Sequence, residues 1–245
     1  MGMIKTEKEI KNLKKSAVIT DSCIKVIENS LKERVTEIEL RRRIGRKIRS
    51  QHAALAFQTI VASGKRSAMI HPKPYATCNK ISGIGYVDFG ASYKNYKTDI
   101  TVPFIVGKVG KKEMKIVKTT LKAYKLSISS IKIGDYCWKL FQKIYNFEKK
   151  NGFKLKHGLG HGLGKKIHEY PFIVIPKKEK LKRSVTEKRK RNWEKIKEII
   201  FQKNMIFTIE PGIYVNNIGG CRLENDILMT SKGPKILTHS KLIHI

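Results

Sequence analysis

Residues 86–106 constrain the fold more than any other stretch, because two strand-like segments flank a two-residue turn. The segments are Tyr86–Tyr93 and Tyr96–Val106, and Lys94-Asn95 lie between them. Asn tolerates the positive φ that a tight hairpin turn requires. The pattern therefore predicts an antiparallel hairpin, and a turn at this position fixes which residues lie opposite one another.

The predicted hairpin carries two aspartates on one face. A two-residue turn places Asp88 opposite Thr101 and Asp99 opposite Gly90. Since side chains two positions apart on a strand share a face, the two aspartates are diagonal neighbours, roughly 7 Å apart or less. Such carboxylates repel each other unless they are solvated or bridged by a cation. From these residues alone, a solvated polar face and a metal site both remain open.

The rest of the chain alternates helix-like and strand-like segments, which predicts an α+β fold and one domain over residues 1–245. Thr36 is the expected N-cap of the second helix, with Glu39 as its capping-box partner, and Asp135 the expected cap of the fourth. The expected helices are Thr6–Leu31, Thr36–Ala54, Lys111–Ser130 and Asp135–Lys150. The further expected strands are Phe57–Ser63, Met205–Tyr214 and Cys221–Thr230.

The chain is strongly basic, with 52 Lys and Arg against 20 Asp and Glu, a formal charge of +32. Residues 177–203 carry 12 basic and 4 acidic side chains, so 12 − 4 = +8 of this charge lies in one segment. The rest is spread along the chain, which indicates a general compositional bias, and nucleic-acid binding is not expected. The segment 177–203 is expected to be a basic helical insertion. It could rim a site or bind an acidic partner, but a solvated helix is favoured.

The location expected for the chain is the cytoplasm. No apolar run approaches the roughly 18 residues that span a bilayer, so no membrane association is expected. The N-terminus has positive charge without an apolar segment behind it, unlike a secretory leader. The four cysteines are scattered without a CxxC pair, which is typical of reduced, mostly buried thiols.

Histidine and acidic residues gather in three later segments. Residues 157–164 (HGLGHGLG) combine two histidines with four glycines, and His168 follows closely, a density that favours function over structure. Glu210 ends an apolar strand-like segment. Residues 222–226 (RLEND) alternate polar and apolar side chains, so the polar ones share a face. For the last two segments an exposed strand face is the alternative.

Four ordered motifs together resemble a known family. They are VDFGASYKNYKTDIT, HGLGHGLGKKIHEYP, FTIEPGIYV and GGCRLENDILMT, at 87–101, 157–171, 207–215 and 219–230. They resemble the dinuclear metallopeptidases of the pita-bread fold, which include methionine aminopeptidases, Xaa-Pro aminopeptidases and Xaa-Pro dipeptidases (prolidases). The resemblance covers nearly the whole chain apart from the basic insertion. It implies two similar α-β halves, with helix pairs covering a curved antiparallel sheet.

The resemblance implies a site for two divalent metal ions. Asp99 and Glu224 would bridge both ions, and the full set of implied ligands is Asp88, Asp99, His161, Glu210 and Glu224. Four carboxylates and one imidazole suit Mn(II), Fe(II) or Co(II), with Zn(II) as a further candidate. Two such ions can share a water and lower its pKa. Glu210 would then carry the proton of that water to the leaving amine.

The resemblance also implies residues that act on a peptide or dipeptide substrate. His71 would contact its leaving side, His168 would polarise the scissile carbonyl, and His157 would lie on the proline side. Tyr214 and Arg222 would support the site, and Arg222 could pair with a nearby carboxylate. A homodimer is also considered.

HGLGHGLG, EPGIY and RLENDIL match the Xaa-Pro branch better than the methionine aminopeptidases. The expected activity is therefore hydrolysis of an N-terminal Xaa-Pro bond. Removal of an initiator Met is the alternative within the enzyme class. A non-catalytic pita-bread module that binds a macromolecule is the alternative outside it.

Overall fold

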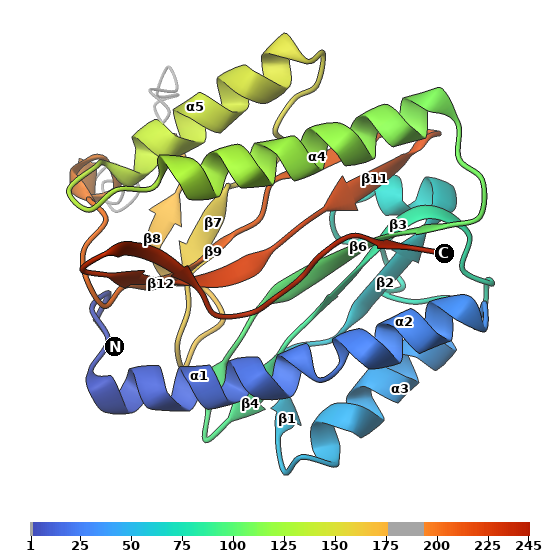
Figure 1. Ribbon diagram of the computed structural model, residues 1–245, viewed down its shortest axis with the longest axis horizontal. Helices are drawn as coiled ribbons and strands as arrows, with labels where there is room; N and C mark the ends of the chain where they lie inside the picture. The colour runs from blue at the N-terminus through green and yellow to red at the C-terminus, as the bar shows by residue number, and fades with distance from the viewer. Residues whose placement is uncertain (1, 176–193) are drawn as a thin grey trace, which may run out of the picture.

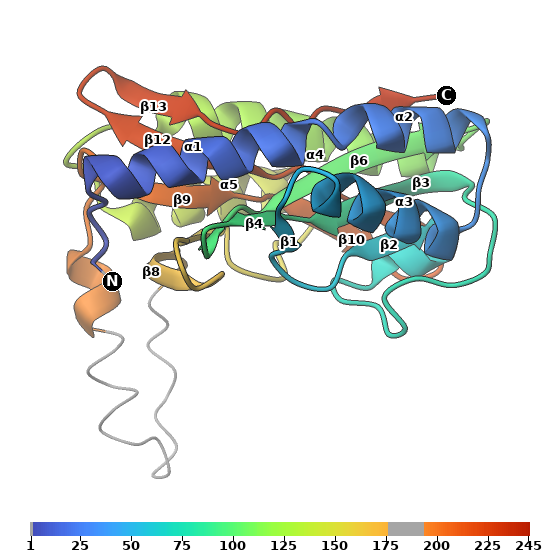
Figure 2. The ribbon, with the colours of Figure 1, turned by 90° about the horizontal axis from the view of Figure 1, so that it is seen from below.

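The computed structural model describes residues 2–175 and 194–245. Its helices lie on two sides of the central strands, with α1, α2 and α3 on one side of the view in Figure 1 and α4 and α5 on the other. Seen from below in Figure 2, α1 and α2 lie in the upper part with β12 and β13, whereas α3 lies lower with β1, β2 and β8. The helices are α1 (Glu7–Asp21), α2 (Ile24–Lys32), α3 (Glu37–Arg49), α4 (Lys111–Ser130) and α5 (Cys137–Lys150).

The first half of the chain, together with the C-terminal strand β14, builds a four-stranded sheet in the order β14-β6-β3-β2. Its strands pair antiparallel, except that β14 is parallel to β6. A small sheet in the order β1-β4-β5 extends the hairpin. The strands are β1 (Ala54–Leu55), β2 (Ile60–Ser63), β3 (Gly83–Phe89), β4 (Ala91–Tyr93), β5 (Tyr96–Lys97), β6 (Ile100–Val106) and β14 (Ile243–His244).

The second half builds a five-stranded antiparallel sheet in the order β13-β12-β9-β7-β8, together with the ribbon β10-β11. An isolated antiparallel bridge between Thr101 and Glu224 joins this half to β6 of the first. The strands are β7 (Gly160–Gly162), β8 (Glu169–Ile173), β9 (Ile206–Ile209), β10 (Gly212–Val215), β11 (Gly219–Arg222), β12 (Asn225–Thr230) and β13 (Gly233–Ile236).

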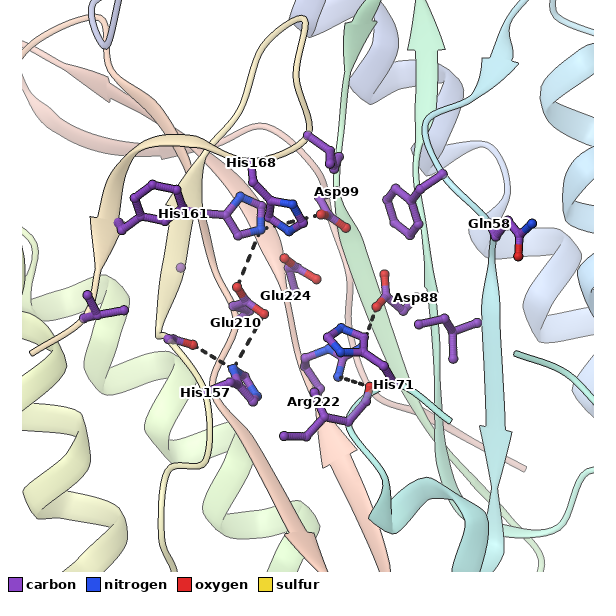
Figure 3. Close-up of a pocket in the computed structure, with 18 of the residues that line it drawn as sticks. Gln58, His71, Asp88, Asp99, His157, His161, His168, Glu210, Arg222 and Glu224 are labelled. Atoms are coloured by element: carbon purple, nitrogen blue, oxygen red, sulfur yellow. Dashed lines mark hydrogen bonds and ion pairs between the residues drawn. The ribbon is translucent and has the colours of Figure 1, made fainter. Parts of the chain in front are cut away.

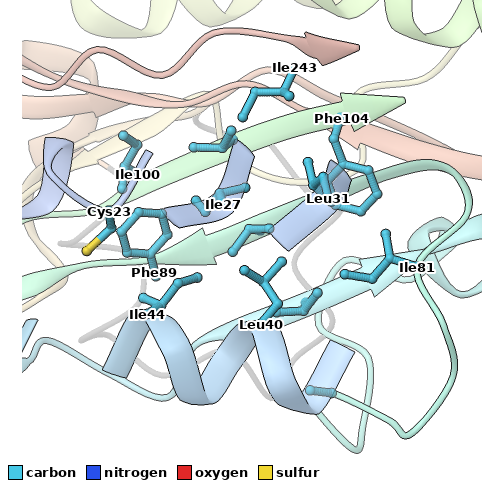
Figure 4. Close-up of a cluster of buried hydrophobic side chains, with 14 of the residues drawn as sticks. Cys23, Ile27, Leu31, Leu40, Ile44, Ile81, Phe89, Ile100, Phe104 and Ile243 are labelled. Atoms are coloured by element: carbon cyan, nitrogen blue, oxygen red, sulfur yellow. The ribbon is translucent and has the colours of Figure 1, made fainter. Parts of the chain in front are cut away.

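Each half has its own hydrophobic core. In the first half, Leu31 of α2 and Leu40 of α3 pack with Phe89 and Phe104 from β3 and β6 (Figure 4). In the second half, α4 and α5 pack against strands β9 and β12, with Phe207 and Ile227 among the buried side chains. Burying each apolar helix stripe on its own sheet is the main stabilising contribution in both halves.

The expected elements differ from the observed ones mainly at their ends. The helix expected over Thr6–Leu31 is two helices, because Ser22 Oγ and Cys23 N–H bond to preceding carbonyls and turn the chain. The helix over Lys111–Ser130 is confirmed. Asp135 is not the cap of α5, whose N-cap is Tyr136.

Two other local expectations have mixed outcomes. Thr36 is the N-cap of α3 and accepts a hydrogen bond from Glu39 N–H. The reciprocal half of the capping box is absent from this described helix, because the Glu39 carboxylate binds Arg43 and Arg46 instead. The strand expected over Phe57–Ser63 begins only at Ile60.

Most of the basic insertion expected at 177–203 lies outside the described residues, which resume at Glu194. All four cysteines are free, three of them buried, as their spacing predicts. Within the described ranges, every helix is too short or too polar to cross a bilayer.

Candidate metal centre

The hairpin of the first half positions the two aspartates as the sequence predicts. Asp88 of β3 pairs with Thr101 of β6, and the turn residues Lys94 and Asn95 have φ of 49° and 65°. Gly90 is required here, because a Cβ on it would lie 1.9 Å from the Thr98 carbonyl oxygen. The pairing across the hairpin places Asp88 and Asp99 on the same face.

The second half brings three more ligand-type side chains to the same place (Figure 3). His161 lies on β7, Glu210 directly follows β9, and Glu224 lies between β11 and β12. The backbone N–H of Glu224 donates to the Thr101 carbonyl oxygen over 3.1 Å, which places its side chain beside the hairpin aspartates.

Ligand atoms of these side chains converge in overlapping groups of three. Within each group one ligand atom from each residue lies within 4.8 Å of the others, as in Asp88 with Asp99 and Glu224, and in His161 with Glu210 and Glu224. His161 Nε2 lies 3.7 Å from an Asp99 oxygen and 3.6 Å from a Glu210 oxygen. All five residues of the implied ligand set therefore surround one small volume.

The electrostatics of this cluster suit divalent cations. Desolvation and neighbouring carboxylates raise the pKa of Asp99 and of Glu224 well above their usual range, and desolvation raises that of Glu210 to about 8. Asp88 Oδ1 and Glu224 Oε1 are buried without a hydrogen-bond partner among the described residues. Buried acceptors of this kind are costly unless a cation or a donor reaches them. The residues present thus fit a site for two divalent ions.

His161 is prepared to bind a metal through one nitrogen. Its Nδ1 lies 3.1 Å from the carbonyl oxygen of Gly162, which fixes the proton on Nδ1 and leaves the Nε2 lone pair free. Burial lowers the pKa of His161 to about 4, so the imidazole is neutral at physiological pH. Its backbone N–H donates to Thr208 Oγ1 over 3.1 Å, which holds β7 against β9.

Arg222 fixes one side of the cluster, and the expectation that it pairs with a carboxylate is confirmed. Its guanidinium donates to Asp88 over 2.5 Å, to Tyr214 Oη over 2.7 Å and to Thr101 Oγ1 over 2.9 Å. It also lies over the Tyr86 ring, 4.4 Å from the centroid. Asp88 is thereby held in one orientation, with its second oxygen directed away from Arg222.

Three histidines line the open side of the cluster, around a cavity of about 620 Å³. His157 Nδ1 lies 2.7 Å from the Gly158 carbonyl oxygen, and its Nε2 lies 3.0 Å from Tyr214 Oη. Arg222 donates to the same hydroxyl, so Tyr214 donates in turn to His157. Burial lowers the pKa of His157 to about 3, which keeps the ring neutral.

His71 and His168 line the same cavity and are less buried than His157. The His168 ring packs edge-on against His161, with centroids 4.3 Å apart. A His168 nitrogen also comes within 4.8 Å of ligand atoms of Asp99 and His161. The rest of the lining is largely apolar, with Phe57, Ile60, Ile70, Tyr75, Ile167, Phe172 and Val174.

The family follows from a match to the model of metallopeptidase family M24 over residues 11–231. The chain belongs to this family. It is similar to the Xaa-Pro dipeptidase of Pyrococcus horikoshii, with 32% identity over 244 residues, 98% of this chain and 64% of the relative.

Solved structures support the fold of this M24 chain. The prolidase from Pyrococcus furiosus aligns with a TM-score of 0.82 and 31% identity, over 98% of this chain and 66% of that one. The Xaa-Pro dipeptidase from Bacillus anthracis aligns with a TM-score of 0.83 and 32% identity, over 99% and 64%. The pita-bread fold is confirmed, and the chain spans just under two thirds of the length of these relatives.

Two residues of the site, Thr101 and Asp226, were given no role in the sequence analysis. Thr101 Oγ1 donates to Glu224 over 2.6 Å while it accepts from Arg222, and Asp226 accepts the backbone N–H of Asp99 over 3.3 Å. Thr101 could have been found from the predicted pairing opposite Asp88. The alternative of an exposed strand face at 222–226 is wrong, since Arg222, Glu224 and Asp226 are 2%, 2% and 1% exposed.

Proposed function

We propose that this chain is a metal-dependent exopeptidase that hydrolyses the N-terminal Xaa-Pro bond of a peptide or dipeptide. The observation that carries the proposal is the convergence of Asp88, Asp99, His161, Glu210 and Glu224 on one small volume at the base of a cavity. The similar relatives named above, an Xaa-Pro dipeptidase and a prolidase, support this substrate class.

Those five side chains would hold two divalent ions, and the oxygen-rich set favours Mn(II), Fe(II) or Co(II). When bound, the ions supply Lewis acidity that polarises a carbonyl and lowers the pKa of a water. Glu210 lines the cavity, with a carboxylate oxygen 3.8 Å from His157 Nδ1, and can accept a proton and return it to the leaving amine.

The histidines orient the substrate in this proposal. His168 stands at the mouth of the cavity beside His161, where a neutral imidazole can donate a hydrogen bond to the oxygen of the scissile carbonyl. His157 is held by Tyr214 and Gly158, and presents its ring to the proline side. His71 lines the cavity from the first half and contacts the leaving side.

Two alternatives are less well supported. Methionine aminopeptidase activity is less well supported, because the similar proteins described above are Xaa-Pro dipeptidases and a prolidase. A non-catalytic binding module would have no need for a complete set of ligand-type side chains, and this chain retains all five.

The experiment that tests the function compares three peptides after reconstitution with Mn(II) or Co(II). We expect hydrolysis of Ala-Pro at least about tenfold faster than that of Met-Ala and of Met-Ala-Ser, because the site is proposed to select proline. Preferential release of Met from Met-Ala-Ser would make the chain a methionine aminopeptidase. Stoichiometric metal without hydrolysis of any peptide would favour the binding module.

A further inference from the structure

A second cavity, of about 720 Å³, adjoins the candidate active site. Its walls include His168 and Phe172, and both residues also line the active-site cavity. Three lysines, Lys165, Lys166 and Lys195, line the second cavity as well. A basic cavity therefore meets the catalytic one at two shared side chains.

Strand β8 forms a continuous wall between the two cavities. Burial alternates along β8 and into Val174, which directly follows the strand. Tyr170, Phe172 and Val174 are half-buried, whereas Pro171 and Ile173 are buried, as expected for alternate faces of a strand. Val174 and Phe172 line the active-site cavity, whereas Phe172 and Tyr170 line the second one. The Tyr170 and Phe172 rings pack edge-on with centroids 5.0 Å apart, which makes the wall apolar without a break.

The wall begins on the proposed proline side of the active site. Val174 packs against Gly158, since a Cβ on that glycine would lie 3.0 Å from Val174 Cγ1, and Gly158 directly follows His157. The wall covers roughly 13 Å over the four residues from Val174 to Tyr170, and Phe172, which lines both cavities, lies halfway along it. An extended peptide that continues along this wall beyond the proline passes Phe172 after about two residues and there enters the cavity that the three lysines line.

The second cavity carries excess positive charge. Its lining residue Glu169 is already engaged, because it binds the buried ammonium of Lys5 over 2.9 Å and the backbone N–H of Lys166 over 3.0 Å. Within the described ranges, Lys165, Lys166 and Lys195 form no ion pair with an acidic side chain. Lys195 Nζ lies 5.0 Å from the centroid of the Tyr170 ring, at the end of the apolar wall.

We propose that the second cavity binds the residues that follow the proline, and that it favours peptides with a carboxylate one or two positions beyond it. This inference rests on the proposed Xaa-Pro activity. The carboxylate is that of an acidic side chain or of the C-terminus, and both have the same chemistry toward the lysines. The chain is then suited to acidic peptides longer than a dipeptide.

The test measures kcat/KM at low ionic strength for four peptides: Ala-Pro, Ala-Pro-Gly-Gln amide, Ala-Pro-Gly-Glu amide and Ala-Pro-Gly-Gln with a free C-terminus. We expect the two tetrapeptides that carry a carboxylate to be cleaved about 3- to 10-fold better than the uncharged amide, the size expected for a few exposed ion pairs. Added salt should reduce the preference. A preference for only one of the two identifies the source of the carboxylate.

Two matched triple variants test whether the preference for a carboxylate comes from the lysines of the second cavity or from the overall positive charge of the chain. Lys165→Gln/Lys166→Gln/Lys195→Gln should remove the preference for a carboxylate, with the uncharged amide as the internal reference. The control, Lys118→Gln/Lys122→Gln/Lys125→Gln on the exposed side of α4, removes the same amount of charge elsewhere. This variant should keep the preference for a carboxylate.

The outcomes distinguish this inference from the proposed function. If Ala-Pro is hydrolysed but no tetrapeptide is preferred, the role of the second cavity is overturned and the Xaa-Pro activity stands. The same holds if both triple variants lose the preference for a carboxylate equally. Failure to cleave Ala-Pro and all three tetrapeptides overturns the Xaa-Pro activity itself.

Discussion

The metal centre and helix α5 both bury carboxyl groups, but their surroundings differ. Glu148 of α5 is fully buried, and neither of its carboxylate oxygens has a hydrogen-bond partner among the described residues. Desolvation raises its pKa to about 8. At the metal centre, the pKa of Asp99 and of Glu224 is raised by desolvation and additionally by the neighbouring carboxylates.

This difference shows why burial alone does not identify a site. One proton makes the lone Glu148 neutral and removes most of the cost of burying it. Four carboxylates around one volume present many acceptor atoms to a common centre, and the two divalent cations proposed for this site would neutralise them together. The convergence of ligand atoms, and not a raised pKa, distinguishes the functional cluster. The following predictions test this comparison, from the largest expected effect on activity to the smallest.

Asp99→Ala and Glu224→Ala should each abolish binding of the metal pair and lower kcat/KM more than about 100-fold. Loss of a residue that only hydrogen-bonds to a metal ligand typically lowers metal affinity or activity about 10- to 100-fold. Asp99 and Glu224 are the proposed bridging ligands themselves, so a larger effect is expected. Metal content by mass spectrometry and hydrolysis of Ala-Pro check this. Either variant with full metal content and normal turnover would contradict the assignment.

His168→Ala should lower kcat by about 10²- to 10³-fold while metal content and fold are unchanged, because a single oxyanion donor contributes this much. His157→Ala should impair Ala-Pro more than Met-Ala, since its ring is proposed to lie on the proline side. Steady-state kinetics with metal analysis measure both. Metal loss in His168→Ala would show that this histidine, which lies near Asp99 and His161, is a ligand instead.

Thr101→Val should weaken metal binding about 10- to 100-fold, because Glu224 loses a donor at 2.6 Å and Arg222 loses an acceptor. Titration of the metal-free protein with Mn(II) measures the affinity. Thr120→Val is the matched control, since this buried threonine donates only to the Cys221 carbonyl oxygen. An equal loss in both variants would make the effect one of general packing.

Glu148→Gln should leave metal content and activity unchanged and alter only the pH dependence of stability. The folded pKa of about 8 exceeds that of the unfolded chain, so the stability contribution is complete below about pH 4.5 and is lost as the pH rises to about 8. From pH 5 to pH 9 the free energy of unfolding should therefore fall by a few kcal/mol more in the native chain than in the variant. Urea unfolding at several pH values measures this, and identical slopes would refute it.

Much of the site could be predicted from sequence because local rules govern its hairpin. The turn at Lys94-Asn95 fixes the pairing of Asp88 with Thr101, and the pairing fixes the face on which Asp99 lies. The convergence with His161, Glu210 and Glu224 could not be derived in that way, because it depends on how the two halves pack. The resemblance to a family supplied that step.

Other features were missed because periodicity does not report them. The apolar spacing continues through Ser22, so the local hydrogen bonds that divide α1 from α2 leave no trace in the pattern. Glu148 lies on the buried stripe of α5 with Leu140 and Ile144, and its position on an apolar face could have been noticed. Asp226 bonds to the backbone of a residue 127 positions away, which no local pattern encodes.

The proposed metal ligands come from both halves of the fold, which the bridge between Thr101 and Glu224 also joins. Asp88 and Asp99 come from the first half, whereas His161, Glu210 and Glu224 come from the second. Cations in the proposed centre would therefore add a crosslink between two halves that also share buried apolar clusters, such as Ile84 and Ile105 with Ile213. Cations that bind only the docked halves would stabilise the folded chain by mass action, so a chelator should lower the free energy of unfolding of the metal-loaded protein.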